Sequence, residues 1–145
     1  MKLYILLTAI TCIVLPACNK QFSGPAGTSL SGSWIMTSVQ DISSGAISAK
    51  PASLQGDVVI TFAQNNNASG KFYGHTPSNY ISQSDYQASP GHTLKILNLY
   101  ITKIWETPWG AAFADNIRDA KEYNIDNSGT LTIVTIHNRL TFKKE

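Results

Sequence analysis

Hydrophobic and polar residues alternate along most of this chain with the period of two that is typical of half-buried β-strands. The clearest case is segment 57–62, where Val58, Ile60 and Phe62 fall on one face. The same pattern, bounded by turn residues, predicts further strands at 33–39, 69–74, 84–88, 93–103, 122–125, 130–136 and 140–143. We therefore expect about eight strands, with turns at 64–67, 90–91, 126–129 and 137–139 and irregular segments at 50–56 and 75–82.

The predicted strand at 93–103 is apolar on both of its faces. Leu94 and Ile96 alternate onto one side, and the other side carries Leu97, Leu99 and Ile101. We expect the first side to line the core and the second to be covered, with a helix as the candidate cover.

A single helix is predicted after Thr107. The threonine hydroxyl suits an N-cap, and Pro108 suits the first helical position. Apolar residues then recur at helical spacing until the helix ends near Ala120, and they are expected to form one buried face: Trp109, Phe113, Ile117 and Ala120. The expected fold is mainly β, an antiparallel barrel or strongly curved sheet of about eight strands with one packed helix.

The start of the chain follows a different pattern. Lys2 is positive, residues 3–15 are almost wholly apolar, and the sequence then reads Leu-Pro-Ala-Cys. These are the marks of a secretory signal, and the apolar run is shorter than the roughly 20 residues that a membrane-spanning helix needs. We expect a signal peptide at 1–17, a flexible tether at 18–29 that contains Gly, Pro and Ser, and one domain at 30–145.

The Leu-x-Ala-Cys ending resembles the bacterial lipobox, although Pro16 stands where a small residue is usual. The resemblance implies that Cys18 carries a diacylglyceryl group on its thiol and an acyl chain such as palmitate on its amino group, which anchor the protein in a membrane. No acidic cluster follows the cysteine, which favours the outer membrane facing the periplasm as the location. An ordinary cleaved signal with a chance cysteine is the alternative.

Charge and cysteine content exclude some classes of partner and of covalent bond. The chain has 11 basic and 9 acidic residues and two cysteines. Loss of the predicted signal removes Lys2 and Cys12, so a nearly neutral domain without a free thiol or disulfide is expected. No basic run is present, and nucleic acid is not an expected partner.

The order of the predicted elements, with several short motifs, resembles the META/HslJ-like domain. Members open with Leu-x-Gly-x-Trp, and the matching positions here are Leu30 to Trp34, Asn79-Tyr80, Ile101-Thr102, Phe113 and Tyr123-Asn124-Ile125. Many members carry Gly-Cys-Asn where this chain has Gly74-His75-Thr76, so no cysteine-linked property is transferred.

The META/HslJ resemblance implies a cell-envelope protein of non-enzymatic interaction or stress-response type. Leu-x-Gly-x-Trp also opens lipocalin-like domains, which makes a carrier of a small apolar ligand the first alternative. An envelope enzyme or enzyme inhibitor is the second alternative, and it would need a cleft with converging polar groups and a carboxylate with a shifted pKa.

The sequence contains no pattern that points to catalysis or to a metal. The three histidines His75, His92 and His137 are far apart, and no Gly-x-Ser-x-Gly motif occurs. We therefore expect no catalytic residue, no bound metal and no cofactor.

Aromatic side chains are the remaining candidates for binding, because Tyr and Trp combine contact area with a polar group. Trp34, Trp109 and Phe113 are expected in the core. A binding surface for an envelope protein, a glycan or a small apolar ligand is expected at Tyr80, Tyr86 and Trp105.

Overall fold

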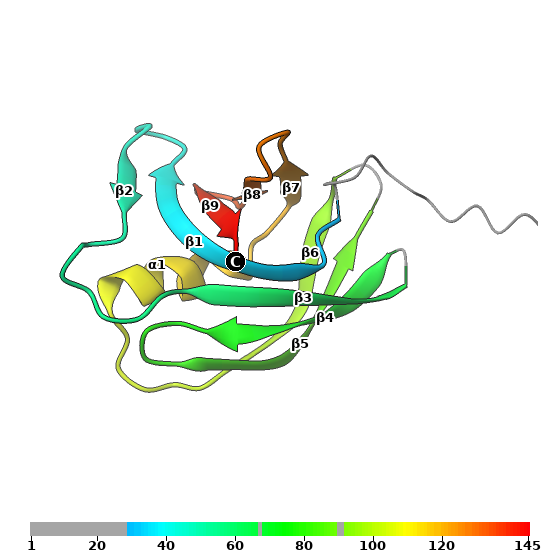
Figure 1. Ribbon diagram of the computed structural model, residues 1–145, viewed down its shortest axis with the longest axis horizontal. Helices are drawn as coiled ribbons and strands as arrows, with labels where there is room; N and C mark the ends of the chain where they lie inside the picture. Colours follow the sequence, from blue (N-terminus) through cyan, green and yellow to red (C-terminus); the bar gives the residue numbers. More distant parts are fainter. Residues whose placement is uncertain (1–28, 67, 90–91) are drawn as a thin grey trace, which may run out of the picture.

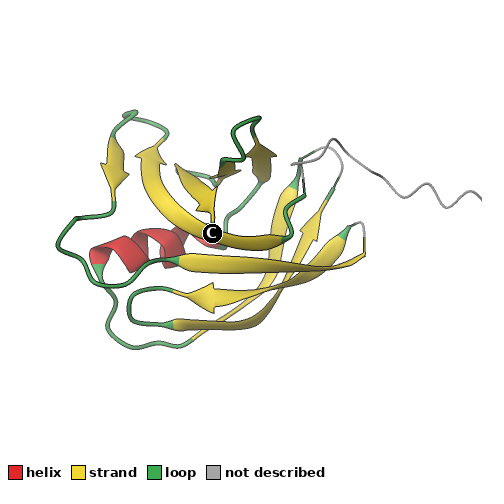
Figure 2. Cartoon of the chain, viewed as in Figure 1, coloured by secondary structure: helices red, strands yellow, loops and turns green. Residues whose placement is uncertain are grey.

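The computed structural model describes residues 29–145 except 67, 90 and 91. The predicted signal peptide, Cys18 and nearly all of the predicted tether lie outside this range. Figures 1 and 2 show a mainly β domain whose elements are β1 (Gly32–Asp41), β2 (Ile47–Ala49), β3 (Val59–Asn66), β4 (Ser69–His75), β5 (Tyr80–Ala88), β6 (Leu94–Ile101), α1 (Pro108–Ile117), β7 (Glu122–Ile125), β8 (Leu131–Val134) and β9 (Asn138–Lys144). In the part of the chain that is described, no helix is long and apolar enough to cross a membrane.

Eight strands form one antiparallel sheet in the order β6-β5-β4-β3-β1-β9-β8-β7, and β2 pairs with β1 beside that path. The sheet curls until its outer strands meet at one point. There Thr93 bridges Glu122, and the backbone N–H of Leu94 donates to the carbonyl of Lys121 at 2.9 Å. The expected fold class, a strongly curved antiparallel sheet with one helix, is confirmed.

The predicted helix and its buried face are also confirmed. The Thr107 hydroxyl accepts from the backbone N–H of Gly110 at 3.1 Å, and Pro108 is the first helical residue. Trp109, Phe113 and Ile117 are buried, and the Phe113 ring meets the Phe142 ring of β9 edge-on. The helix ends at Ile117, earlier than expected, although Ala120 beyond it is still buried.

The expectation that β6 buries two opposite faces is wrong. Residues Asp85 and Tyr86 of β5 pair with Asn98 and Ile96, so Leu97 is an extra residue on β6 that has no partner of its own. Such a bulge reverses the alternation of side chains beyond it. As a result Leu99 and Ile101 pack against the same core as Leu94 and Ile96, whereas Leu97 is 44% exposed.

Other boundaries differ from the prediction. β5 begins at Tyr80 within the segment expected to be irregular, and β3 continues to Asn66 through most of the expected turn at 64–67. The short strand β2 was not predicted, because all three of its residues are exposed and show no alternation.

A hydrogen bond within the Leu-x-Gly-x-Trp segment joins its last residue to its first. The Trp34 side chain is 1% exposed, and its indole N–H donates to the carbonyl of Leu30 at 2.8 Å. Gly32 between them adopts φ 116°, a value that side chains strongly disfavour. The expectation that Trp34 belongs to the core is confirmed.

Candidate functional site

Two loops meet at one end of the sheet, and Asn79 joins them. This residue, in the β4–β5 loop, is 3% exposed. Its side-chain oxygen accepts from the backbone N–H of Ile104 and from the Thr102 hydroxyl, each at 3.0 Å, and its side-chain N–H₂ donates to the carbonyl of Ile104 at 3.3 Å. The amide of Asn79 therefore serves as hydrogen-bond partner to the loop between β6 and α1.

The carboxylate of Glu106 completes this junction from the second loop. One oxygen accepts from the Thr76 hydroxyl and from the side-chain N–H₂ of Asn79, the latter at 2.8 Å. The other oxygen accepts from the backbone N–H of Thr107 at 2.9 Å, directly before α1. Glu106 thus links both loops to the start of the helix.

These bonds keep Glu106 ionised. Burial raises the pKa of its carboxyl, but hydrogen bonds donated by Thr76, Asn79, Thr107 and Ser78 lower it, and the net result is a pKa below the ordinary value. Because both oxygens already accept hydrogen bonds, the arrangement suits a structural carboxylate that holds the loops in place.

Gly110 in the first turn of α1 leaves room for this carboxylate. A Cβ atom at position 110 would lie 2.3 Å from Oε1 of Glu106, which is closer than any real contact. The glycine therefore has a packing role even though glycine weakens a helix interior.

A hollow of about 220 Å³ lies beside the junction. It is lined by the six consecutive residues from His75 to Tyr80, and its wall combines polar and apolar groups. The loop that lines it is ordered from within, because the backbone N–H of Thr76 donates to the carbonyl of Asn79 at 2.8 Å.

Large apolar side chains protrude from the β6–α1 loop and from the start of β5. Trp105 is 79% exposed, Tyr80 73% and Ile104 64%. The backbone N–H of Thr102 donates to the carbonyl of Tyr80 at 3.0 Å, which holds the β6–α1 loop against the first residue of β5. We refer to Tyr80, Ile104 and Trp105 together as the aromatic tip.

The aromatic tip lies at the end of the sheet opposite to the start of the domain. Near the start, the Ser31 hydroxyl donates to the side chain of Gln64 at the far end of β3. In Figure 1 the chain enters β1 on the right, whereas β5 begins and β6 ends on the left, close to α1. The tip therefore faces away from the point where any N-terminal tether joins the domain.

Of the three residues predicted to form a binding surface, the structure brings Tyr80 and Trp105 to the same end, but the placement of Tyr86 on that surface is wrong. Tyr86 is 2% exposed, its ring meets the ring of Phe62 edge-on, and burial raises the pKa of its hydroxyl to about 12. It pairs across the sheet with Gly70, where a Cβ atom would lie 2.7 Å from the tyrosine ring. The space left by that glycine lets Tyr86 point into the core.

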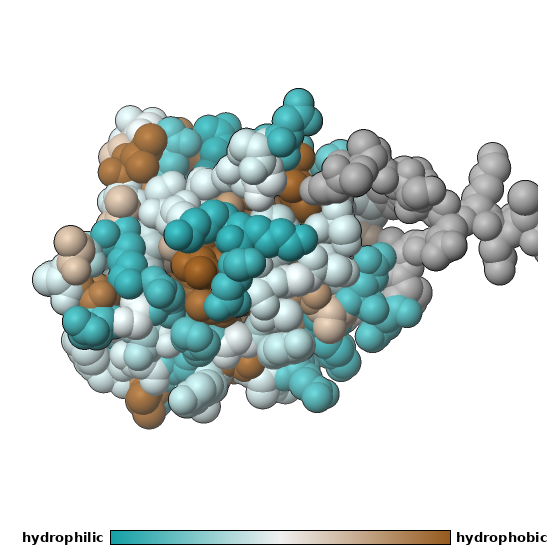
Figure 3. Space-filling model, in the orientation of Figure 1, coloured by the Kyte–Doolittle hydropathy of each residue, from teal (hydrophilic) through white to brown (hydrophobic). Residues whose placement is uncertain are grey.

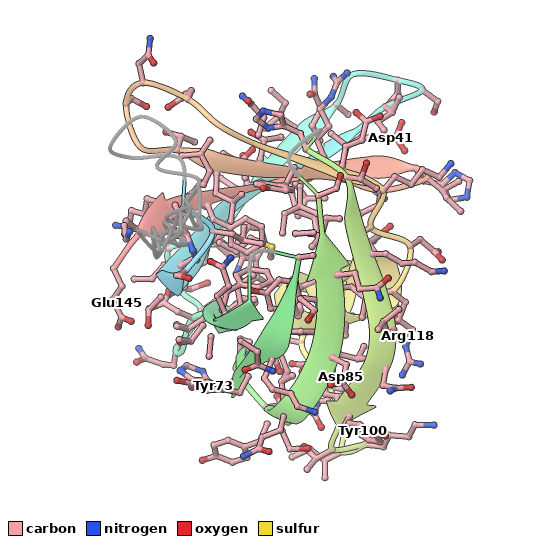
Figure 4. All side chains as sticks on the ribbon, turned by 90° about the vertical axis from the view of Figure 1, so that its right-hand side faces the viewer. Asp41, Tyr73, Asp85, Tyr100, Arg118 and Glu145 are labelled. Atoms are coloured by element: carbon pink, nitrogen blue, oxygen red, sulfur yellow. The ribbon has the colours of Figure 1, made fainter. Side chains whose placement is uncertain are left out.

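The outer face of the sheet beside the tip is of mixed character. Figure 4 shows Tyr73, Asp85 and Tyr100 on β4, β5 and β6. Asp85 forms an ion pair with Lys71 at 2.5 Å and accepts from Asn98 at 3.1 Å, so its charge is balanced within the sheet. Tyr73 and Tyr100 are about half exposed on either side of β5.

A second group of exposed apolar residues lies elsewhere, at the ends of β1 and β2. It consists of Ile42, Ile47 and Ile136, and the backbone N–H of Ile42 donates to the carbonyl of His137 at 2.8 Å. Figure 3 shows apolar area at this end of the molecule, over β2, and only small scattered apolar areas across the rest of that face.

Sequence reasoning missed the residues that build the junction. Asn79 was named only as part of the Asn-Tyr motif, and Ile104 and Glu106 were not proposed as partners of it. Their bonds join residues 25 to 30 positions apart, and no local pattern signals such a pairing. Within the described residues, no group of three or more His, Cys, Asp or Glu side chains is placed to hold a metal ion.

Comparison with known proteins shows the fold alone. No family model and no curated protein matches the chain. A solved NMR structure of a protein from Burkholderia xenovorans is similar to it with a TM-score of 0.50 and 18% sequence identity, over 79% of this chain and 81% of that one.

Proposed function

We propose that this chain is a membrane-anchored cell-envelope lipoprotein that acts by non-covalent binding through its aromatic tip. The observation that carries the proposal is the exposure of Trp105, Ile104 and Tyr80 beside a buried polar junction that holds the β6–α1 loop against the start of β5. Large apolar side chains that protrude from an ordered surface commonly mark an interaction site. Acylation of Cys18, in the outer membrane facing the periplasm, would hold this site at a membrane.

The packing of the domain favours this function over that of a lipocalin-like carrier. A carrier needs an apolar cavity of a few hundred Å³ inside its barrel. Here the inside of the curled sheet is filled by side chains that are at most 1% exposed, among them Trp34, Phe62, Phe72, Phe113 and Phe142.

The polar junction likewise supports a structural role. An enzyme that uses a carboxyl group as a general acid needs its pKa raised toward neutrality, whereas the pKa of Glu106 is lowered. The META/HslJ resemblance agrees with a non-enzymatic envelope protein, and we keep that family as part of the proposal.

The anchor is tested by metabolic labelling: cells that express the full chain are grown in medium that contains an alkyne-bearing fatty acid. We expect label on the wild-type protein and its recovery in the membrane fraction. Cys18→Ser should abolish both, while Cys12→Ser, the matched control within the predicted signal, should leave both unchanged. Label that survives Cys18→Ser, or a wild-type protein that remains unlabelled, would show that the anchor is wrong.

The binding surface is tested by a photo-crosslinking amino acid at position 105 and, as control, at position 47, which is also an exposed site. Illumination of cells should yield adducts of the variant at 105 that the variant at 47 does not give. Equal or absent adducts at both positions would contradict binding by the tip.

A further inference from the structure

We propose that the aromatic tip inserts into the headgroup–acyl boundary of a lipid bilayer, so that the domain contacts the membrane at a second point besides its anchor. This inference rests on the proposed function in placing the tip near a membrane, and it adds the identity of the binding partner. Tyr80, Ile104 and Trp105 would enter the boundary, and Lys103 would remain at the phosphate groups.

The types of residue at the tip fit this boundary. Trp and Tyr are enriched where membrane proteins cross the interface, because each has an apolar ring and a polar group that stays hydrated. Ile104 adds a purely apolar side chain between Lys103 and Trp105. Lysine suits the same depth, since its apolar stem lies among apolar groups while its ammonium reaches water.

Part of the backbone at the tip already has the hydrogen-bond partners that a medium with little water requires. A peptide group that enters an apolar phase without a hydrogen-bond partner is strongly destabilised. At Ile104 both groups are already paired, because the N–H donates to Asn79 at 3.0 Å and the carbonyl accepts from Asn79 at 3.3 Å. The N–H of Thr102 is paired as well, with the carbonyl of Tyr80.

Lys103 places an exposed positive charge at the tip, and this charge has the sign that anionic headgroups attract. Lys103 is exposed, and the two ion pairs found among the described residues, Lys50–Asp57 and Lys71–Asp85, do not include it. No acidic residue occurs between Tyr100 and Trp105. The next one, Glu106, is ionised but only partly exposed, and both of its oxygens accept hydrogen bonds inside the junction, so Lys103 is the more accessible charge.

The shape of the tip also favours a fluid partner. Side chains that are 64–79% exposed project outward, so a rigid protein would need a matching pocket for each of them. Lipid chains rearrange around such projections without a preformed pocket. The observations therefore favour a bilayer over a protein or a glycan.

The bilayer that holds the anchor is within reach. The 12 residues from Cys18 to Ser29 can span at most about 40 Å. The nine residues of β5, which run the length of the domain from the tip, span about 30 Å. We infer that the long axis of the domain lies along this membrane when the tip is inserted.

The test uses the chain from residue 18 onward with Cys18→Ser, which contains every described strand, the helix and the whole core. It is mixed with vesicles of phosphatidylethanolamine and phosphatidylglycerol, and separately with vesicles of phosphatidylcholine. Binding is measured by flotation and by tryptophan emission. Trp34 and Trp109 are 1% and 5% exposed, so a change in emission reports on Trp105.

We expect flotation with the anionic vesicles and a shift of the emission to shorter wavelength, both weaker with phosphatidylcholine. Ile104→Ser should weaken binding by about tenfold, because an isoleucine no longer enters the apolar region. The matched control Ile47→Ser changes an isoleucine that is 68% exposed, against 64% for Ile104, in the second apolar group. It should bind within about twofold of the starting chain.

Three results would overturn the inference. The first is no flotation and no shift in emission with either vesicle, and the second is an equal loss of binding in Ile104→Ser and Ile47→Ser. The third is a chain that ignores vesicles yet is retained on an insoluble glycan, which would assign the tip to a carbohydrate. Fatty-acid labelling of Cys18 is independent of all three, so failure of the anchor and failure of the tip are distinguishable.

Discussion

The side chain of Asn79 and the backbone of Ile104 hydrogen-bond to each other in both directions, at 3.0 and 3.3 Å. These residues belong to different loops, and Asn79 is buried although it is polar. The side-chain amide of Asn79 thus pairs with the backbone of Ile104, beyond the end of β6, as a neighbouring strand would. This relationship places the exposed side chains of the tip on a fixed support.

Replacement of Asn79 by alanine is expected to lower the free energy of unfolding by about 2–3 kcal/mol, since several buried partners lose their hydrogen bonds at once. Chemical denaturation measures the loss. The control Asn98→Ala removes an exposed amide that donates to Asp85, and a change within about 0.5 kcal/mol is expected there. Equal effects would mean that the junction contributes no special stability.

Gly110→Ala is expected to destabilise the protein by about 1–3 kcal/mol, because the new Cβ atom clashes with Glu106. Inside an ordinary helix the same change stabilises by up to about 1 kcal/mol, so the sign of the effect is diagnostic. The measurement is thermal or chemical unfolding of Gly110→Ala, Glu106→Ala and the double variant. If the clash is the cause, the double variant is more stable than the sum of the two single changes predicts.

Acid is expected to destabilise the domain partly through Glu106. Its carboxyl has a folded-state pKa below the ordinary 4.5, so the unfolded chain binds a proton first as the pH falls. The stabilisation is complete above that ordinary value and is lost as the pH drops through the folded-state pKa. Unfolding free energies measured across this window should fall less steeply in Glu106→Gln than in the wild type.

The control for this pH dependence is Glu122→Gln, which changes an exposed carboxylate on β7 outside the junction. We expect its acid limb to follow the wild type. Asp41 contributes to the loss of stability in acid in the wild type and in both variants, because hydrogen bonds from Ser43 and Ser44 lower the pKa of its carboxyl to about 2. An unchanged slope in Glu106→Gln would show that the junction does not depend on the charge.

Leu97 and Leu99 are two positions apart and would share one face of a regular strand, but the bulge in β6 predicts that their replacement has different effects on stability. Leu99→Ser should cost about 2 kcal/mol, because Leu99 packs against the core. Leu97→Ser should change stability by less than about 0.5 kcal/mol, since this side chain points outward. Similar losses on chemical denaturation would rule out the reversed alternation.

Much of the fold was predictable because its signals are local. Alternation placed Val58, Ile60 and Phe62 on one buried face, and capping by Thr107 and Pro108 set the start of α1. The missed features depend on neighbours in space. Leu99 and Ile101 face the core only because the unpaired Leu97 reverses the alternation of side chains in β6, and this bulge follows from how β5 and β6 pair.

The candidate site divides in the same way. Residue type alone identified Tyr80 and Trp105 as candidates, and the structure places them at the start of β5 and in the loop that is held against it. The sequence could not exclude Tyr86, because the burial of this residue depends on the space left by Gly70 on the next strand. The sequence also could not identify Ile104, because this residue is positioned by its hydrogen bonds to Asn79.

The sequence by itself determined that the domain is a curved antiparallel sheet with one capped helix, because strand periodicity and helix capping act between residues close along the chain. Only the tertiary structure decided which aromatic side chains fill the core and which protrude. Exposure depends on what distant segments leave uncovered, and the support of the tip depends on hydrogen bonds between loops that meet only when the sheet has curled.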